Sequence, residues 1–309
     1  MISAPRNEYY IEGLFQNACH REMHHMTTDW ALLGAPPPDM LTEPRLQLHR
    51  AMQLVPAVGD AYVRPAQDYS HSSAQWSSEH RVLLGNPTDT DPVLRVGLAP
   101  AQLALVVHDD RGTEFMRYML DGSSIEESYA WLQSVIAQRL RSDPKPLARS
   151  ELELPPGPGA GESRFVLDDP PAFEELARWY GNADLLLGGL RKSTPEASPV
   201  RCWPHHFDIA VLIPVGEAPS GEGARSIGVG VTPGDDSYAV PYWYVTPWPY
   251  PESPELPELP SGGEWHTQDW VGAILTADRL TRSSAQEQQR QVEDFVGAAV
   301  RACRKMLPG

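Results

Sequence analysis

The sequence predicts an α+β fold, an antiparallel sheet with helices packed on one face. Short runs rich in β-branched residues alternate with turn signals, and each group of runs is framed by segments with helical periodicity. This helix–strands–helix order occurs twice along the chain. The 31 prolines and 24 glycines favour many turns over long helices. We therefore expect two similar α+β halves, each contributing strands to one sheet or to a sheet of its own.

The chain divides into an N-terminal extension of residues 1–40, a first half of residues 41–142, a linker of residues 143–170 and a second half of residues 171–309. The linker contains the run PPGPGAG, whose composition is typical of a spacer because it offers little apolar surface to bury. The second half is longer between its strands and its last helix. Its additional residues form an aromatic and Pro-rich insertion at residues 238–269.

In the first half, apolar residues at helical spacing predict a helix from Pro44 to Tyr62, with a kink expected at Pro56. A second helix begins at Ser123 or Ser124, each followed three residues later by a glutamate, which is a capping-box pattern. The strands predicted between these helices are Arg81–Leu84, Val93–Leu98, Gln102–His108 and Glu114–Leu120. A further short helix is expected in the extension, around Glu12–Met26.

The second half repeats this order. A helix begins at Pro171, and a closing helix begins near Ser284, where Glu287 completes a capping box. The predicted strands are Phe207–Val215, Ser226–Thr232, Tyr238–Thr246 and Val271–Leu275. Both halves contain a similar phrase, VGLAP at residues 96–100 and VGVTP at residues 229–233. It indicates duplication of one unit, although a chance likeness between two strand–turn–strand segments is the alternative.

Charge and hydropathy exclude several classes of function. The formal net charge of −16 has the wrong sign for binding nucleic acid or anionic lipid. No apolar run is long enough to span a membrane, and the N-terminus lacks the apolar core of a signal peptide, so we expect a cytoplasmic protein. The three cysteines, Cys19, Cys202 and Cys303, are too few and too distant for a disulfide framework.

The second half holds the candidate metal ligands and catalytic residues. On a strand, His206 and Asp208 would project to one face, opposite the apolar residues that follow. With His266 and one of Asp208, Asp235 or Asp236, His206 gives the two histidines and one carboxylate that a catalytic zinc or iron often takes. We expect His206, Asp208 and His266 to be catalytic. The alternative is that these residues only hydrogen-bond loops and turns, because their spacing matches no standard motif. In that alternative His205, on the apolar face of the strand, is a core histidine.

The insertion is unusually aromatic. If residues 242–244 form a strand, Tyr242 and Tyr244 face one side and Trp243 the other, so one set lines a surface while its opposite packs in the core. Aromatic walls with a few polar groups are typical of ligand pockets, whereas Pro-flanked aromatics also build rigid loops that pack on themselves. The candidate ligand-binding residues are Trp203, Tyr242, Trp243, Tyr244, Trp248 and Trp265.

Histidines outside the second half carry weaker signals. His20 and His24 are four residues apart, a spacing that can hold one metal ion on a helix, although a solvated segment is the simpler interpretation. His71 holds roughly the position in the first half that His205 and His206 hold in the second. A pocket between the halves would therefore also include His71.

Three phrases carry a resemblance to a known family: PVRCWPHHFDIA at residues 199–210, VGVTPGDDSY at residues 229–238 and PYWYVTPWP at residues 241–249. With them the chain resembles a family of uncharacterised bacterial proteins, a domain of unknown function. The resemblance spans most of residues 44–300, and the N-terminal extension lies outside it. It implies a shared fold, and it implies no activity, cofactor or catalytic residue.

Two functions are compatible with these patterns. In the first, the protein binds a small molecule in a cleft of the second half lined by aromatic, histidine and aspartate residues, and a bound divalent metal would make it a metal-dependent enzyme. In the second, the Trp-, Tyr- and Pro-rich loop docks a partner protein without catalysis, with a homodimer through the same surface as a variant.

Overall fold

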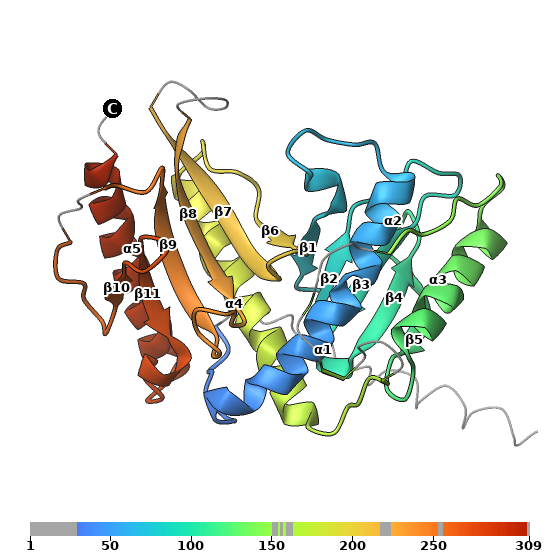
Figure 1. Ribbon diagram of the computed structural model, residues 1–309, viewed down its shortest axis with the longest axis horizontal. Helices are drawn as coiled ribbons and strands as arrows, with labels where there is room; N and C mark the ends of the chain where they lie inside the picture. Colours follow the sequence, from blue (N-terminus) through green and yellow to red (C-terminus); the bar gives the residue numbers. More distant parts are fainter. Residues whose placement is uncertain are drawn as a thin grey trace, which may run out of the picture.

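The computed structural model describes residues 30–149, 154, 157–158, 163–216, 224–252 and 256–307. The strands in these residues form one antiparallel sheet (Figure 1), which confirms the predicted α+β class. In order across the sheet they are β10 (Glu264–His266), β11 (Gly272–Thr276), β9 (Tyr242–Trp248), β8 (Arg225–Thr232), β7 (Asp208–Val215), β6 (Arg201–Trp203), β1 (Ala74–Ser77), β2 (Val82–Gly85), β3 (Arg95–Ala99), β4 (Ala104–His108) and β5 (Glu114–Met119).

The helices pack on one face of this sheet, as predicted. They are α1 (Thr42–Met52), α2 (Leu54–Tyr62), α3 (Ile125–Arg139), α4 (Pro170–Ser193) and α5 (Ala285–Met306). Buried residues of all five belong to one hydrophobic core with alternate residues of the strands, such as Leu83, Leu98 and Ile209. In Figure 1, α1 and α2 lie in front of the strands of the first half, whereas α4 lies behind β7 and β8, because the sheet twists between the two halves.

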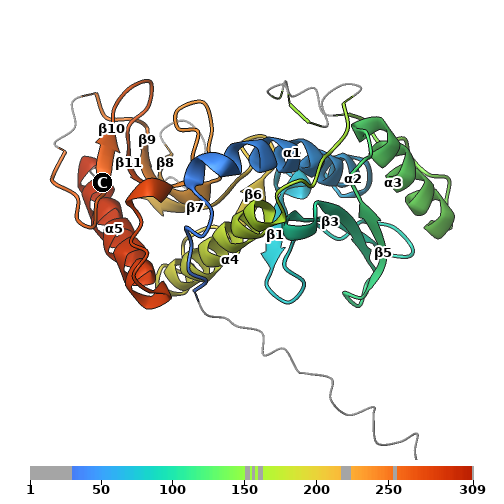
Figure 2. The same ribbon diagram turned by 90° about the horizontal axis from the view of Figure 1, so that it is seen from below.

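The two halves join through the antiparallel pair β1 and β6, where Ala74 lies opposite Cys202. Beside this pair the Arg201 guanidinium donates a hydrogen bond to Ser73 Oγ at 2.9 Å. Helix α4 packs against both β1 and β7, so it crosses the junction (Figure 2). The halves therefore share one sheet and one core.

Equivalent turns show that both halves follow the same path. Arg81 and Phe207 both have φ 56°, a left-handed conformation unusual for residues other than glycine, and each immediately precedes the second strand of its half. The amide of Arg81 bonds the Ser77 carbonyl and the amide of Phe207 bonds the Trp203 carbonyl, both at 2.7 Å. The strands β3 and β8, which contain the shared VGLAP and VGVTP phrases, occupy corresponding places in the strand order.

Several boundaries differ from the prediction. The first helix is interrupted at Gln53, three residues before Pro56, because the ring of a helical proline clashes with the carbonyl four residues earlier, here that of Met52. Strands β1 and β6, which are only four and three residues long, were not predicted. Within the predicted linker, Phe165 is fully buried in the core.

The predicted strand from Tyr238 begins only at Tyr242, because the preceding residues form a turn around Asp235. The insertion adds β10 at the edge of the sheet, outside β11. The helix expected around Glu12–Met26, with His20 and His24, lies outside the described residues.

Candidate functional site

Most of the predicted site residues lie at one end of the second half, around the face of the sheet that carries none of the five described helices, which we call the helix-free face. Ala210, Gly230 and Tyr244 stand side by side on this face, because they are paired across β7, β8 and β9. Asp208 and Tyr242 occupy the next row toward the sheet end, two residues along their strands. The predicted alternation is therefore confirmed for Asp208, Tyr242 and Tyr244.

Asp208 is the most buried carboxyl group of this face, with 8% of its surface exposed. Its Oδ2 accepts a hydrogen bond from the Tyr244 hydroxyl at 2.5 Å, whereas its Oδ1 is buried and has no hydrogen-bond partner. Burial raises the pKa of Asp208, and the Tyr244 hydrogen bond and the nearby His206 oppose this rise. The site therefore contains a carboxyl oxygen that the protein itself leaves unsatisfied.

Gly230 makes the contact between Asp208 and Tyr244 sterically feasible. Tyr244 is on β9 and Asp208 on β7, so the tyrosine side chain must cross β8. A Cβ atom on Gly230 would lie 2.7 Å from the Tyr244 hydroxyl and 2.7 Å from the Ile209 carbonyl oxygen. Only glycine leaves room for this crossing.

Asp235 anchors a second tyrosine. Its Oδ1 accepts the amides of Ser237 and Tyr238 at 2.8 and 3.1 Å, which closes the turn before β9. Its Oδ2 accepts the hydroxyl of Tyr242 at 2.5 Å. Burial and the negative charge of Asp235 both raise the pKa of Tyr242, so its hydroxyl stays protonated. Asp235 is thus a structural residue of the loop as well as a site residue.

His266 forms a third pair with a tyrosine. Its Nε2 lies 2.5 Å from the Gln268 carbonyl oxygen, which can only accept, so Nε2 carries the proton. Nδ1 then accepts a hydrogen bond from the Tyr238 hydroxyl at 2.9 Å. The Trp270 ring stacks on the imidazole at 4.3 Å between centroids. Both nitrogens of His266 are therefore engaged within the insertion.

Helix α1 of the first half reaches the same end of the sheet, which the sequence did not predict. His49 Nε2 donates to the Pro204 carbonyl at 3.0 Å, and its ring stacks on Phe207. Burial lowers the pKa of His49 to about 4, so it is neutral at pH 7. Arg45 has a buried Nε without a hydrogen-bond partner. Burial lowers the pKa of Arg45, and the negative charge of Asp235 opposes this fall.

His205 and His206 are both exposed in the turn before β7, with ring centroids 4.3 Å apart. The strand begins only at Asp208, so the alternation that would have placed His205 in the core does not extend to it. The alternative interpretation of His205 as a core histidine is therefore wrong. His206 lies close enough to Asp208 to influence its pKa.

The five predicted metal ligands, His206, Asp208, Asp235, Asp236 and His266, do not form one cluster. Among the described residues no group of three or more His, Cys, Asp or Glu side chains is arranged to hold a metal ion. Three of the five are instead paired with separate tyrosines. This placement gives the predicted zinc or iron no assembled set of ligands.

The tryptophans predicted to bind a ligand are divided between the two faces. Trp243 is fully buried on the helix side and stacks on Trp30, with ring centroids 5.9 Å apart. Trp265 also faces the core, and its Nε1 donates to the Pro257 carbonyl at 2.8 Å. Trp203 lies opposite Asp208 on the helix-free face. Trp248 is at the far end of that face and is 55% exposed.

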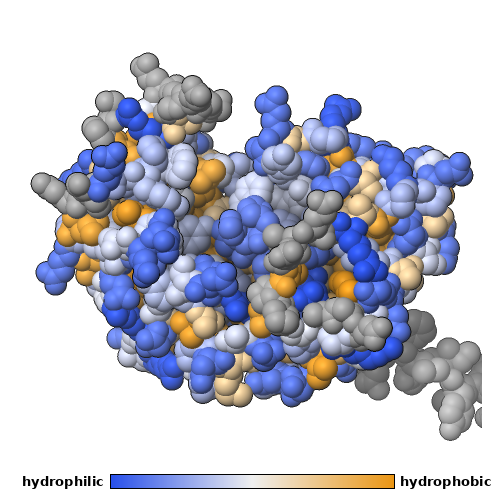
Figure 3. All heavy atoms as spheres, viewed as in Figure 1, coloured by the Kyte–Doolittle hydropathy of each residue, from blue (hydrophilic) through white to orange (hydrophobic). Residues whose placement is uncertain are grey.

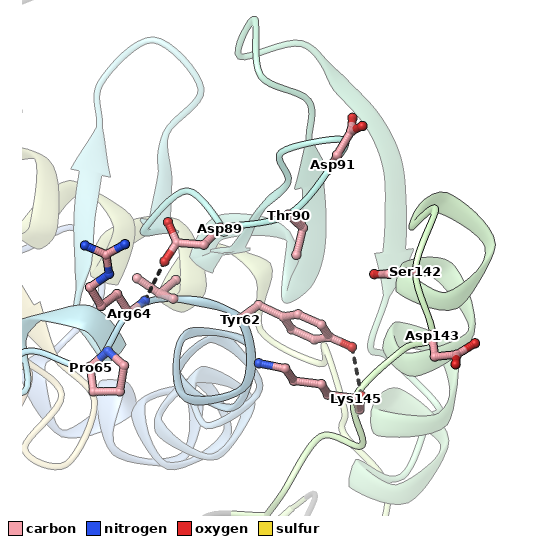
Figure 4. Close-up of a pocket in the computed structure, with 10 residues that line it drawn as sticks. Tyr62, Arg64, Pro65, Asp89, Thr90, Asp91, Ser142, Asp143 and Lys145 are labelled. Atoms are coloured by element: carbon pink, nitrogen blue, oxygen red, sulfur yellow. Dashed lines mark hydrogen bonds between the residues drawn. The ribbon is translucent and has the colours of Figure 1, made fainter.

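None of the three cavities described for this structure is lined by these site residues. Figure 4 shows one of them, of about 450 Å³, in the first half between the end of α2 and the chain that follows α3. Several of its polar groups are already hydrogen-bonded: Tyr62 donates to the Lys145 carbonyl at 2.8 Å, and Asp89 accepts the Arg64 amide at 2.7 Å. Lys145 Nζ bonds the Ala61 carbonyl at 2.7 Å. The cavity walls therefore leave none of these groups unsatisfied.

Comparisons with known proteins identify no relative, since no protein-family model, curated protein or solved structure matches the chain. The resemblance to a family of uncharacterised bacterial proteins stays a prediction. Among the described residues, no helix has both the length and the apolar character needed to cross a membrane.

Proposed function

We propose that this protein is a cytoplasmic small-molecule-binding protein whose site is the helix-free face of the second half, centred on Asp208. The observation that carries the proposal is the buried Asp208 Oδ1, which has no hydrogen-bond partner. An unsatisfied buried polar atom costs about 1 to 3 kcal/mol. A ligand that donates a hydrogen bond to Oδ1 would recover this free energy, and the cost is otherwise unexplained.

The chemistry of the face favours a protonated amine attached to a ring or an apolar group. Because burial raises the pKa of Asp208, a cation beside it restores the ionised carboxylate and gains a charge-assisted hydrogen bond. Farther along the same face, Leu212 and Trp248 are 49% and 55% exposed and offer an apolar contact. Because Oδ1 is closed off from solvent, a neighbouring side chain must shift to admit the ligand.

The proposal does not extend to a metal-dependent reaction. A catalytic metal needs at least three protein ligands around one point, and the described residues offer no such group. Binding alone requires only the carboxyl group, its tyrosine partner and the apolar surface. Asp208 is therefore proposed as the binding group and Tyr244 as the residue that positions it, with no reaction assigned to them, to His206 or to His266.

The test compares three probes of one shape: benzylamine, benzyl alcohol and benzoate. We expect benzylamine to raise the Tm of the wild type by about 2 to 4 °C at ten times its Kd, and the other two to have little effect. Asp208→Asn, which keeps the acceptor for Tyr244, should abolish the shift. Asp184→Asn is the matched control, because Asp184 is another aspartate whose pKa burial raises, to about 6, and it lies on helix α4, outside the helix-free face.

Equal shifts in the wild type and Asp208→Asn would contradict the proposal. So would a wild type that ignores benzylamine at about 10 mM, a concentration that detects a millimolar Kd. A response lost in both aspartate variants would place the binding elsewhere.

A protein-binding function is the second candidate, favoured by the exposed aromatic pair Trp248 and Tyr250, whose ring centroids lie 5.2 Å apart. Exposed Trp and Tyr side chains often anchor interfaces. Seen from the side of Figure 1, however, the surface is mainly hydrophilic and its apolar patches are small and scattered (Figure 3). A homodimer through this pair predicts that Trp248→Ala halves the molar mass measured by light scattering, whereas a monomeric wild type would exclude the homodimer.

A further inference from the structure

An apolar groove of about 570 Å³ lies between α4 and α5. Five aliphatic side chains and two glycines make up its floor, namely Leu185, Leu186, Leu190, Val296, Val300, Gly189 and Gly297. Three cations, Lys192, Arg301 and Arg304, line it with a single carboxylate, Glu293. This local excess of positive charge stands out in a chain whose formal net charge is −16.

The chain itself enters the space between these two helices just before the groove. Trp30 Nε1 and the Leu33 amide both donate to Gln288 Oε1 of α5, at 3.0 and 2.9 Å. The Ala31 amide donates to Asn182 Oδ1 of α4 at 2.8 Å, and the Gly34 amide donates to Glu175 of the same helix. Figure 2 shows this blue segment passing between α4 and α5.

These contacts fix the direction in which the chain runs. Gly34 lies at Glu175 and Ala31 lies at Asn182, so a step toward the N-terminus is a step toward the C-terminal end of α4. The three steps from Ala31 to Gly34 in extended chain and the seven steps from Glu175 to Asn182 in helix both span about 10 Å. Residues 31–34 therefore run alongside α4. The groove begins at Leu185, less than one turn beyond Asn182. Traced from Gly34 back to Trp30, the described chain therefore runs toward the groove.

The sequence before Trp30 has the composition that such a groove requires. It supplies apolar side chains at Leu14, Phe15, Met23 and Met26. Its four carboxylates outnumber its two arginines, which gives the segment a net charge of −2 that complements the cations Lys192, Arg301 and Arg304. From Gln289 to Arg304 the groove extends for about 22 Å along α5, well within the reach of the 29 residues that precede Trp30.

We propose that the segment preceding Trp30 docks in the groove between α4 and α5 of its own chain, with its apolar side chains on the leucine and valine floor. A second copy of the chain fits less well. A two-fold interface would place the same surface on both sides, with three cations and one carboxylate on each, so a second copy brings no excess of negative charge. The N-terminal segment brings opposite charge and is already tethered at the entrance.

Cys19 provides a direct test, because it lies in this segment and the other two cysteines, Cys202 and Cys303, are fully buried. The full chain is labelled at Cys19 with a polarity-sensitive fluorophore. We expect blue-shifted emission and high anisotropy in the wild type. Leu190→Asp, which puts a charge on the groove floor, should shift the emission to the red and lower the anisotropy.

Charge reversal separates docking from a general loss of stability. Arg301→Glu with Arg304→Glu should release the label, because both exposed cations line the groove. Arg290→Glu is the matched control, since Arg290 is exposed on the same helix outside the groove. In this variant the fluorophore at Cys19 should behave as in the wild type. Circular dichroism of each variant verifies that the fold is retained.

Three outcomes would overturn the proposal. The first is red-shifted, low-anisotropy emission already in the wild type. The second is an equal response of Arg290→Glu and the groove variants. The third is a signal that falls when excess unlabelled wild type is added, because a segment docked in its own chain does not exchange with a second copy, whereas one docked in a neighbour does.

Discussion

The two halves of the sheet place different side chains at equivalent positions of the helix-free face. Toward the helices the positions are apolar in both halves, with Leu98 and Leu105 in the first and Val231 and Trp243 in the second. On the other face the first half has a buried apolar cluster, and the second half has carboxyl, hydroxyl and aromatic groups. The first set is Val82, Leu84, Ala99, Ala104 and Val106, and the second is Asp208, Ala210, Thr232, Tyr242 and Tyr244.

The comparison shows that the fold does not require polar groups on this face. The first half forms the same strand path and the same left-handed turn with a valine where the second half has Asp208. A buried carboxyl group is costly, and Tyr244 satisfies only one of its two oxygens. A costly group that the scaffold can do without is most simply explained by binding, and exchanging residues between the halves tests this explanation.

The largest effect is expected for Val82→Asp, which copies Asp208 into the first half. Val82 is fully buried, and its neighbours Ala99 and Ala104 offer no donor. The hydroxyl of Ser77, its partner across the strand pair, is a single donor, so we expect a loss of about 4 kcal/mol in the free energy of unfolding. Urea denaturation measures it, with the nearly isosteric Val82→Thr as control. A loss below about 1 kcal/mol would mean that the first half tolerates a carboxyl group equally well. A buried carboxyl group on this face would then need no explanation by binding.

A smaller difference is expected between alanine substitutions at the two equivalent glycines. In Gly230→Ala the new methyl group would lie 2.7 Å from both the Ile209 carbonyl oxygen and the Tyr244 hydroxyl. In Gly97→Ala it would lie 2.9 Å from the Leu83 carbonyl oxygen and 3.0 Å from the Leu84 side chain, which is flexible. We expect losses of about 3 and about 1 kcal/mol, respectively. Equal losses in urea denaturation would show that Gly230 has no special role in the Tyr244 crossing.

The smallest effect is a gain of stability. The double variant Asp208→Val, Tyr244→Phe removes the buried carboxyl group together with its partner, and we expect about 1 kcal/mol of stabilisation at pH 7. Because burial raises the pKa of Asp208, the folded wild type binds the proton more tightly than the unfolded chain, so its stability falls as the pH rises above the ordinary aspartate pKa.

The advantage of the double variant should therefore shrink as the pH is lowered from 7 toward 4. His49, whose pKa is about 4, contributes an opposite slope that is present in both proteins and cancels in their difference. Urea denaturation at several pH values measures the difference. An advantage that grows toward low pH would show that the native state stabilises ionised Asp208.

Local signals in the sequence were sufficient for the helix starts. Ser124 and Ser284 each accept the amide of a glutamate three residues later at 3.2 Å, because a cap depends only on neighbouring residues. The strands β1 and β6 were not predicted, since each is short and is stabilised by pairing in the completed sheet rather than by its own pattern.

The site was predictable only in part for the same reason. Alternation correctly placed Asp208 and Tyr244 on one face, but their contact depends on a glycine on the strand between them. The VGVTP phrase contains this residue, Gly230, but as a sequence pattern it indicates only a repeat. Arg45 and His49 lie on a helix of the first half, far away in sequence, and no local pattern could have assigned them to this end of the sheet.

The two edges of the sheet bear on how the protein behaves at high concentration. An open sheet has unpaired backbone groups along both outer strands, which can template fibrous aggregation. Here one edge is β10, only three residues long, and the other is β5, where Arg117 forms two hydrogen bonds with Glu114 at 2.7 and 2.6 Å. Short length at one edge and a charged pair at the other oppose strand addition, so the protein resists strand-by-strand polymerisation despite its open sheet.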